Sequence, residues 1–506
     1  MNMMKIAIPK EISHVGDVLL EAGHEAYLVG GCVRDIVLGR EPKDWDIATE
    51  ARPEEVQRIF PESVYENEFG TVGVKTDSED PRLKIIEVTT FRIEDTYSDK
   101  RHPDAVKFAK TIEEDLSRRD FTVNAMALDL RSQTSRTKIR INSKERNQKT
   151  RETLIDPYDG KKDLQSKIIR TVGDPHKRFE EDALRLMRAV RFAVELGFEV
   201  EHGTAHAVKE HAGLLEMIAK ERVRDEFVKI LMAPRAAEGI ILLEDMGLLK
   251  YVVPELREGI GCGQNKHHIY TVFDHNVRAL NYTAEKRYSL EVRLASLLHD
   301  IGKPQVKRGE GPDSTFYNHE VVGARIAAKI MDRLRFPKDI AERVIRLVRF
   351  HLFYYNVGEV TEAGVRRFIQ RVGEDYIDDL FKVREADRIG SGVPKAVPYK
   401  LRHLKFMIEK VKRDPIHPKM LKIRGDTVMQ LLNIPPGPKV GQLLSVLLEE
   451  VLDDPTRNNE EYLSRRVKEL ATYDARELKE LAERAKEKKE EFESGVEENM
   501  KKKFFV

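Results

Sequence analysis

The chain has 506 residues, enough for three or four domains, and its 41% hydrophobic and 35% charged residues are typical of a soluble globular protein. The formal net charge of +1 excludes a bulk attraction to nucleic acid, so any RNA-binding surface must be a local patch. Only two cysteines, Cys32 and Cys262, argue against a disulfide framework and favour a cytoplasmic location. No apolar run reaches the roughly 18 residues of a membrane span, so no membrane association is expected.

The N-terminal part of the chain predicts a compact α/β head on a small sheet. We expect strands over 26–29, 45–48, 72–75 and 84–90, and helices over 13–22, 31–38 and 53–60. Residues 131–151 interrupt this pattern with eight Lys or Arg and one acid, so they predict a surface hairpin or loop. This insertion either contacts RNA or is solvated without a function. From Asp174 onward the pattern is almost wholly helical, and Glu477–Lys503 predicts a solvated charged helix.

A Gly-Gly turn follows the first predicted strand. Gly30 and Gly31 let the backbone approach a phosphate closely, and the helix that begins there offers its N–H groups to an anion. Arg34 adds a guanidinium group for phosphate oxygens. Most Gly-Gly turns are only turns, so this motif depends on the motifs that follow it.

Two carboxylates lie at the second predicted strand. Asp44 and Asp46 are two residues apart, and alternate residues of a strand point to the same face. Their repulsion is costly unless a cation lies between them, and Mg²⁺ is bound in this way beside substrate phosphates. A pair of metals can activate an attacking hydroxyl and stabilise a leaving pyrophosphate. Glu87, a polar residue in the apolar strand over 84–90, is a further candidate for the metal or for water.

Two arginine-rich motifs come next. Arg118 and Arg119 precede an apolar turn and could bind the triphosphate or primer phosphates. The alternative is an ordinary basic turn. A charged segment before them, residues 92–102, predicts a flexible loop. In the predicted helix that starts near Glu181, Asp182 and Arg185 are neighbours at i and i+3. Two more arginines follow in steps of three, and a salt-bridged structural helix is the alternative.

These four motifs, in this order and spacing, resemble the class II tRNA nucleotidyltransferase and bacterial poly(A) polymerase family. The resemblance runs from Tyr27 to about Leu470 and includes Leu154–Pro157, Lys220–Arg222 and Ile434–Pro438. It implies an α+β fold in which a polymerase-β-type nucleotidyltransferase head with a small mixed sheet precedes an all-α neck, HD body and tail. The corresponding domain boundaries are 1–172, 173–255, 256–395 and 396–506.

The resemblance also implies roles for these residues. Asp44 and Asp46 would hold Mg²⁺, and Asp182 and Arg185 would read the base. The other nucleotide-binding residues would be Gly30, Gly31, Arg34, Arg119, Asn124, Arg188 and Arg191. The reaction would be addition of CCA to the 3′ end of tRNA from CTP and ATP without a template. The basic insertion departs from the family, in which a short connection is expected.

Two alternatives stay open at this point. One is an enzyme that adds only A, or a poly(A) polymerase. An enzyme that adds only CC is disfavoured, because the resemblance implies that such enzymes have a shortened loop where this chain has the complete segment from Arg92 to Pro103. The other is an RNA-binding HD phosphohydrolase with an inactive transferase head, against which the intact Asp44 and Asp46 argue. The oligomeric state is open too, with a homodimer as one option.

A second set of metal ligands lies in the helical part. His299 and Asp300 end an apolar helix over 294–298, and further candidate ligands lie on other predicted helices at His275, His319, His351 and Asp387. Imidazoles and carboxylates from successive helices can converge on one or two divalent metals. The order of these residues resembles the HD phosphohydrolase superfamily and implies a divalent transition metal. The alternative is a degenerate HD fold that serves as a scaffold.

Overall fold

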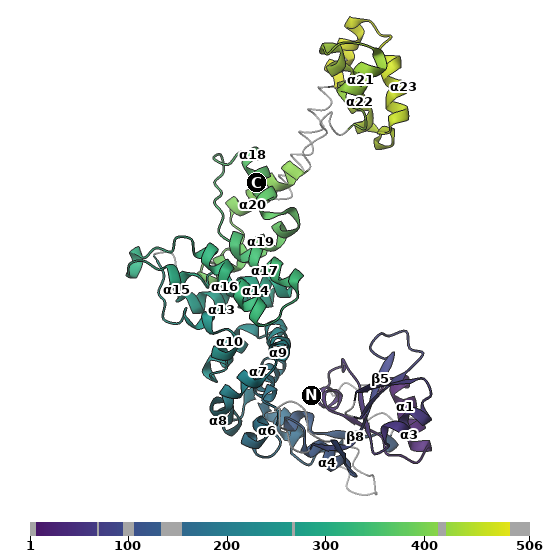
Figure 1. The fold of residues 1–506 in the computed structure, drawn as a ribbon, viewed down its shortest axis with the longest axis vertical. Coiled ribbons are helices and arrows are strands. Elements are labelled where there is room, and N and C mark those ends of the chain that lie inside the picture. The colour runs from purple at the N-terminus through teal and green to yellow at the C-terminus, as the bar shows by residue number, and fades with distance from the viewer. Residues whose placement is uncertain are drawn as a thin grey trace. The chain divides into compact units, whose positions relative to one another are not determined.

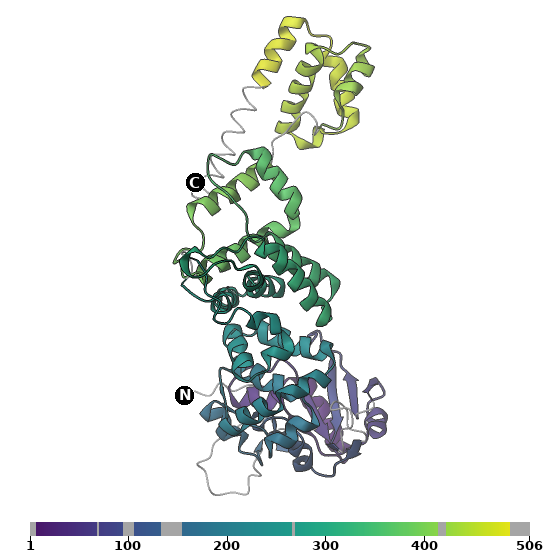
Figure 2. The same cartoon turned by 60° about the vertical axis from the view of Figure 1, so that its left-hand side comes forward.

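The computed structural model describes residues 7–67, 70–94, 106–132, 154–265, 269–412 and 421–485 (Figures 1 and 2). The chain forms two compact units. One contains the chain up to His351 together with Lys382–Val393, and the other contains Leu352–Phe381 and the chain from Pro394 onward. Three predicted segments lie wholly or largely outside the described residues: the basic insertion, most of the loop over 92–102, and the last part of the charged helix. The four-domain division stays a prediction.

A seven-stranded mixed sheet forms the head, in the order β3-β4-β5-β2-β1-β8-β9. The central strands are β1 (Tyr27–Val29), β2 (Asp46–Thr49) and β5 (Ile85–Thr90). β2 and β5 run parallel, and every other neighbouring pair of this sheet is antiparallel. The remaining strands are β3 (Ser63–Asn67), β4 (Thr71–Lys75), β8 (Ala127–Asp129) and β9 (Leu154–Ile155). The expected mixed sheet is therefore confirmed.

Short helices accompany this sheet. They are α1 (Lys10–Glu21), α2 (Gly31–Val37), α3 (Pro53–Ile59), α4 (Ile112–Ser117) and α5 (Gly160–Ser166). Thr111 caps α4 by accepting a hydrogen bond from the Glu114 N–H, and this fixes the start of the helix that precedes the arginine pair. Two small ladders complete the head, β6 (Arg92–Glu94) with β7 (Val106–Phe108), and β10 (Ile168–Ile169) with β11 (Glu199–Val200).

One predicted strand begins later than expected. β2 starts at Asp46, and Asp44 lies in a bend before it, so the two carboxylates are not on alternate positions of one strand. Pro42 has no N–H for a strand ladder, and Lys43 and Asp44 are exposed, which explains the late start. The geometry that brings Asp44 near Asp46 is therefore that of the bend.

Helices dominate the rest of the first unit. They are α6 (Pro175–Glu181), α7 (Leu184–Leu196), α8 (His202–His211), α9 (Lys220–Met232), α10 (Ala236–Asp245), α11 (Leu249–Val252), α12 (Pro254–Arg257), α13 (Val272–Glu285), α14 (Leu290–Leu298), α15 (Lys303–Val306), α16 (His319–Arg333), α17 (Lys338–Phe350) and the end of α19 (Ile377–Gly390). Helix α7 packs against α9 and α10, and α13 packs against α14. Leu186, Met187 and Val190 of α7 are fully buried, so this helix is a core element.

The second unit is helical. α18 (Glu362–Val372) packs against α20 (Tyr399–Lys412), and α21 (Gly425–Leu432), α22 (Pro438–Asp453) and α23 (Glu460–Leu470) pack against one another. Val428, Leu443 and Leu463 are fully buried in the core of these last three helices. Among the residues described, no helix has the length and apolar character that crossing a membrane requires.

Candidate functional site

The Gly-Gly turn brings the first two motifs together. Gly30 has a φ of 74°, which favours glycine, and a Cβ at this position would lie 2.9 Å from Nη1 of Arg119 and 3.6 Å from Oδ2 of Asp46. The positive φ and the close approach of this guanidinium both favour glycine here. The turn therefore lies directly beside Arg119 and Asp46.

Three carboxylate side chains, those of Asp44, Asp46 and Glu87, lie near the start of β2. Asp46 is paired in register with Glu87 of the parallel neighbour β5, and Asp44 is close enough for its charge to act on Asp46. Burial raises the pKa of Asp46, the negative charge of Asp44 raises it further, and Arg119 opposes both effects. An all-oxygen donor set with excess negative charge fits Mg²⁺ better than it fits a softer metal.

A buried acid orients the arginine pair. Asp115 is 1% exposed and accepts from Nη2 of Arg118 at 2.8 Å and from Nη2 of Arg119 at 3.1 Å. Although burial raises the pKa of Asp115, the two guanidinium groups hold it below its ordinary value. Asp115 is part of the helix before the motif, and its pairing gives both arginines a fixed direction.

Asp120 connects three motifs that are far apart in sequence. Its Oδ2 accepts from Nε of Arg188 at 2.7 Å, and its Oδ1 accepts from Nδ2 of Asn124 at 3.3 Å. Oδ1 of Asn124 in turn accepts from Nη1 of Arg34 at 2.9 Å. Burial raises the pKa of Asp120, but the charges of Arg188 and Arg185 outweigh burial and hold it at about 2. The head and helix α7 are thereby joined through one ionised side chain.

The motif that contains Asp182 and Arg185 is not one continuous helix, contrary to the prediction. Asp182 ends α6 with an extended backbone, and α7 begins at Leu184. Oδ1 of Asp182 accepts from the N–H of Leu184 at 3.0 Å, so its side chain competes with helix formation at this point. Its Oδ2 accepts from Nη2 of Arg222 at 3.3 Å, a contact that the sequence did not predict. The backbone still joins the two residues, because the N–H of Arg185 donates to the carbonyl oxygen of Asp182 at 3.0 Å.

The other arginines of this motif have partners within the protein. Arg185 donates from Nη1 to Oε2 of Glu181 at 2.6 Å and from Nη2 to the carbonyl oxygen of Arg118 at 3.1 Å. Arg191 donates from Nη1 to Oε1 of Glu226, which is 3% exposed, at 2.9 Å. Helix α9 thus contacts two residues of the motif, through Arg222 and through Glu226. Three buried acids that contact predicted site residues, Asp115, Asp120 and Glu226, were not predicted from the sequence.

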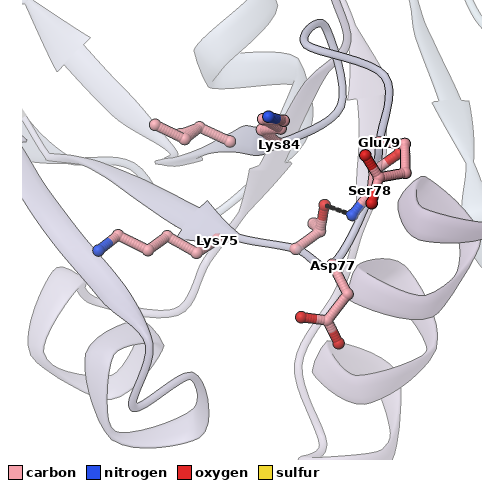
Figure 3. Close-up of a pocket in the computed structure, with 7 residues that line it drawn as sticks. Lys75, Asp77, Ser78, Glu79 and Lys84 are labelled. Atoms are coloured by element: carbon pink, nitrogen blue, oxygen red, sulfur yellow. Dashed lines mark hydrogen bonds between the residues drawn. The ribbon is translucent and has the colours of Figure 1, made fainter.

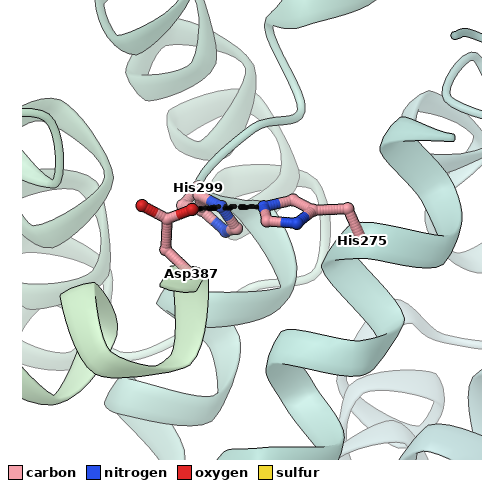
Figure 4. A group of neighbouring side chains, drawn as sticks. All are labelled: His275, His299 and Asp387. Atoms are coloured by element: carbon pink, nitrogen blue, oxygen red, sulfur yellow. Dashed lines mark hydrogen bonds and ion pairs between the residues drawn. The ribbon is translucent and has the colours of Figure 1, made fainter. Parts of the chain in front are cut away.

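The six predicted ligands of the second site converge in the first unit, in two groups. Ligand atoms of His275, His299 and Asp387 lie within 4.8 Å of one another, and so do those of Asp300, His319 and His351. In Figure 4, the His275 and His299 rings point toward each other and toward the Asp387 carboxylate, with 2.8 Å between the two Nε2 atoms. All six side chains are buried.

Asp300 lies between the two groups. Its Oδ2 is 3.2 Å from Nε2 of His275, and its Oδ1 is 3.3 Å from Nε2 of His319. Nζ of Lys303 lies 2.6 Å from Oδ2 of Asp300. Although burial raises the pKa of Asp300, the Lys303 charge and His299 hold it well below its usual range. An ionised carboxylate with one oxygen toward each group has the geometry of a bridging ligand.

Three of these imidazoles are fixed by backbone carbonyl groups. His299, His319 and His351 each place Nδ1 at 2.7–2.8 Å from the carbonyl oxygen three residues earlier. A carbonyl oxygen only accepts, so Nδ1 carries a proton and Nε2 is the ring nitrogen that faces the centre and could bind a metal. Nitrogen and oxygen donors in this arrangement fit a divalent transition metal.

A shallow hollow in the head lies apart from these residues. It is formed where β4 leads into β5 and is lined by Lys75, Thr76, Asp77, Ser78, Glu79, Lys84 and Ile85 (Figure 3). Its two lysines are balanced by two acids, and none of the predicted site residues lines it. No anion or nucleotide site is indicated there.

Comparison with known proteins identifies the family. Residues 26–170 match a poly A polymerase head domain, residues 197–260 a probable RNA and SrmB-binding site of polymerase A, and residues 272–390 an HD domain. The chain is 34% identical to an A-adding tRNA nucleotidyltransferase of Deinococcus radiodurans over 84% of this chain and 91% of that one. The chain belongs to the tRNA nucleotidyltransferase and poly(A) polymerase family.

Other members of this family are similar over nearly their whole length. A CCA-adding enzyme of Enterococcus faecalis is 31% identical over 91% of this chain and 97% of that one. The crystal structure of the Bacillus stearothermophilus CCA-adding enzyme in complex with CTP superposes with a TM-score of 0.57 at 28% identity, over 91% of this chain and 96% of that one. The polymerase-β-type head and helical body expected from the sequence are therefore confirmed, and the chain is a nucleotidyltransferase with an HD domain.

The Asp120 network yields a prediction about stability. We expect Asp120→Asn to lower the free energy of unfolding by about 2–3 kcal/mol, because it leaves Arg188 without its ionised partner in a site that is only partly open to solvent. The folded pKa of about 2 lies below the ordinary 3.8, so the contribution is complete above about pH 4 and is lost as the pH falls through 2. Denaturant unfolding of both proteins at pH 7 and at pH 3 measures this difference.

Asp80→Asn is the matched control, because Asp80 pairs with Arg82 on the surface of the same head at 2.7 Å. An exposed pair of this kind contributes little, so the control should unfold like the unchanged protein. Equal stability of the Asp120 variant and the control at pH 7 would show that Asp120 does not join the head to α7.

Proposed function

We propose that this protein adds CCA to the 3′ end of tRNA, using CTP and ATP and no nucleic-acid template. The observation that supports it most is the convergence of three separate motifs, which contribute Arg34, Asn124 with Asp120, and Arg188 to one chain of hydrogen bonds. The names of similar family members, two of them CCA-adding enzymes and one an A-adding enzyme, support the same reaction.

Asp44 and Asp46 would hold the Mg²⁺ ions, with Glu87 beside them in register. When bound, Mg²⁺ lowers the pKa of the attacking hydroxyl and neutralises charge on the departing pyrophosphate. The RNA 3′ oxygen forms a bond to the α-phosphorus as the bond to the pyrophosphate oxygen breaks. Gly30 and Gly31 leave room for the triphosphate at the N-terminus of α2, and Arg34 and Arg119 supply donors to it.

Asp182 is suited to read the edge of the base. An ionised carboxylate offers about four lone-pair sites, and the contacts with Leu184 and Arg222 use one on each oxygen, which leaves acceptors on a side chain already held in place. Cytosine and adenine share an amino donor beside a ring-nitrogen acceptor, whereas uracil and guanine present the reverse. Asp182 would accept from the amino group, and Arg185 would donate to the ring nitrogen. On the same helix as Arg185, Arg191 is held by its hydrogen bond to Glu226, and Arg188 is held by its hydrogen bond to Asp120.

The Deinococcus similarity keeps an A-adding enzyme as the second candidate. Such an enzyme would use the same carboxylates and the same base edge, so the site residues do not separate the two. They differ in whether the first two nucleotides are added as well.

We also propose that the HD centre is a metal-dependent phosphohydrolase. Asp300, between two groups of ligands, would bridge two metals, with His275, His299 and Asp387 on one side and His319 and His351 on the other. The contacts that orient the rings support a functioning site over a degenerate scaffold, because a scaffold does not require the Nε2 atoms to face the carboxylates of their own group.

Loss of one carboxylate should stop nucleotide addition. We expect Asp46→Asn to lower the rate of CTP and of ATP incorporation by roughly a thousandfold or more, because an amide binds Mg²⁺ poorly and the metals supply several kcal/mol of charge stabilisation. Asp77→Asn, an exposed change elsewhere in the head, is the control and should keep its rate. The rate is measured in a single-turnover assay with tRNA lacking CCA. Near-normal CTP incorporation by Asp46→Asn would show that the Asp46 carboxylate is not required for nucleotide addition.

Base choice should depend on Asp182. The amide of Asp182→Asn can donate as well as accept, so we expect it to raise UTP and GTP misincorporation relative to CTP and ATP by roughly 5- to 150-fold, the equivalent of about 1–3 kcal/mol. Competition among the four nucleotides at fixed total concentration gives this ratio. Glu180→Gln, an exposed change on the same helix, is the control. A variant that loses rate on all four nucleotides with unchanged selectivity would place base recognition elsewhere.

The HD centre should act independently of the transferase. We expect hydrolysis of a phosphomonoester or a 2′,3′-cyclic phosphate to require an added transition metal, and His299→Ala with Asp300→Ala to abolish it while nucleotide addition continues. Metal content and hydrolysis are measured on the same preparations, with His14→Ala as the control. Absence of metal from the unchanged protein, together with no hydrolysis under any divalent metal, would establish the scaffold alternative.

A further inference from the structure

A second group of imidazoles lies on the surface of the first unit, apart from the HD centre. Helix α6 packs against α8 (Figure 1), and their outward faces carry His176 on α6 and His206, Glu210 and His211 on α8. Side-chain exposure is 47% at His176, 62% at His206 and 52% at Glu210. Neither the transferase site nor the HD centre uses any of these residues.

The four side chains form an open chain of close contacts. Nδ1 of His176 lies 3.1 Å from Nε2 of His211 and 3.5 Å from Oε2 of Glu210. The same oxygen of Glu210 lies 3.6 Å from Nδ1 of His206. The rings of His176 and His211 meet edge to face, with their centroids 5.3 Å apart. Nδ1 of His176 and Oε2 of Glu210 each contact two other candidate ligand atoms, so the chain of contacts spans both helices.

These distances are those of ligand atoms around a small metal. Zn²⁺ binds imidazole nitrogen and carboxylate oxygen at about 2.0–2.2 Å in a tetrahedron, which places neighbouring ligand atoms about 3.3–3.5 Å apart. The three successive contacts of 3.1, 3.5 and 3.6 Å lie close to that spacing. The four ligand atoms do not yet all lie within 4.8 Å of one another, as those of the HD groups do, so metal binding requires rotation of these exposed side chains about their own bonds.

We propose that His176, His206, Glu210 and His211 bind one divalent transition metal, with Zn²⁺ as the best fit, and that this metal ties α6 to α8. Three imidazoles with one carboxylate suit Zn²⁺, Ni²⁺ or Cu²⁺ and do not suit Mg²⁺, which takes oxygen ligands. The site is therefore chemically distinct from the carboxylate pair in the head.

The position of α6 gives the metal a consequence. α6 ends at Glu181, directly before Asp182, and Glu181 accepts from Arg185. Ligands on each of two packed helices add a crosslink that exists only in the folded state, so binding at His176, in the first turn of α6, stabilises the packing of α6 against α8. This inference does not depend on the proposed function of either enzymatic site.

Zinc titration of the full chain tests the proposal. Equilibrium dialysis is performed with Zn²⁺ in the presence of excess Mg²⁺, which occupies oxygen-only sites. The unchanged protein should bind one equivalent more than His176→Ala with His211→Ala. His14→Ala with His24→Ala removes the same number of imidazoles from the head and should bind like the unchanged protein. Co²⁺ substitution should give the visible absorption of a tetrahedral site in the unchanged protein, and the double variant at α6 and α8 should lack that contribution.

Two further variants test whether the metal is bound by these residues and not by the HD centre. Glu210→Gln should weaken this equivalent at least roughly tenfold and leave the fold unchanged, because the side chain is exposed. His299→Ala with Asp300→Ala should lose the metal of the HD centre and keep the equivalent at α6 and α8, which separates failure of one site from failure of the other. Equal stoichiometry and affinity for Zn²⁺ in the unchanged protein and in His176→Ala with His211→Ala would overturn the proposal.

Discussion

The ion pair between Asp120 and Arg188 is the interaction on which the transferase site depends. Asp120 belongs to a turn of the head, Arg188 belongs to a core helix, and Asn124 extends the contact to Arg34 at the Gly-Gly turn. Charge-assisted hydrogen bonds in a buried setting are stronger and more directional than those at the surface. One ionised carboxylate therefore holds the Gly-Gly turn and helix α7 at a fixed separation.

Helix α9 contacts both groups of candidate site residues. Near its start Arg222 contacts Asp182, and further along Glu226 contacts Arg191. At its end, Nη1 of Arg293 donates to the carbonyl oxygens of Leu231 and Ala233 at 2.7 and 3.2 Å. Arg293 lies on α14, and the next residues after that helix are His299 and Asp300. Within this unit, the proposed base-reading residues and the candidate metal ligands of the HD domain are thus attached to the two ends of one helix.

Much of the fold follows from local sequence signals, and the exceptions have physical causes. The helices at 31–37 and 184–196 and the strands β1, β4 and β5 were predicted because apolar periodicity and turn residues mark them. Strands β8 and β9 were not, because segments of two or three residues become strands only through their neighbours in the sheet. The break at Asp182 was missed because its cause is a side-chain hydrogen bond that competes with the helix.

The candidate sites show the same division. Residues that would touch metal or nucleotide stand in short motifs and could be named from the sequence. Their buried partners could not, because Asp115, Asp120 and Glu226 look like ordinary acids beside arginines until burial is known. The six HD ligands could be named in order, but their division into two groups around Asp300 needed three dimensions.

The proposed function requires one protein site to select cytosine and adenine without a template and to add them in order to tRNA. It is tested by sequencing the 3′ ends of tRNAs that lack CCA, CA or only A, after incubation with CTP, ATP or both. We expect CC from CTP alone on tRNA that lacks CCA, CCA from the two nucleotides together, and a single A on tRNA that ends in CC. Addition of A alone, with no C added under any condition, or growth of a long A tail, would rule out CCA addition.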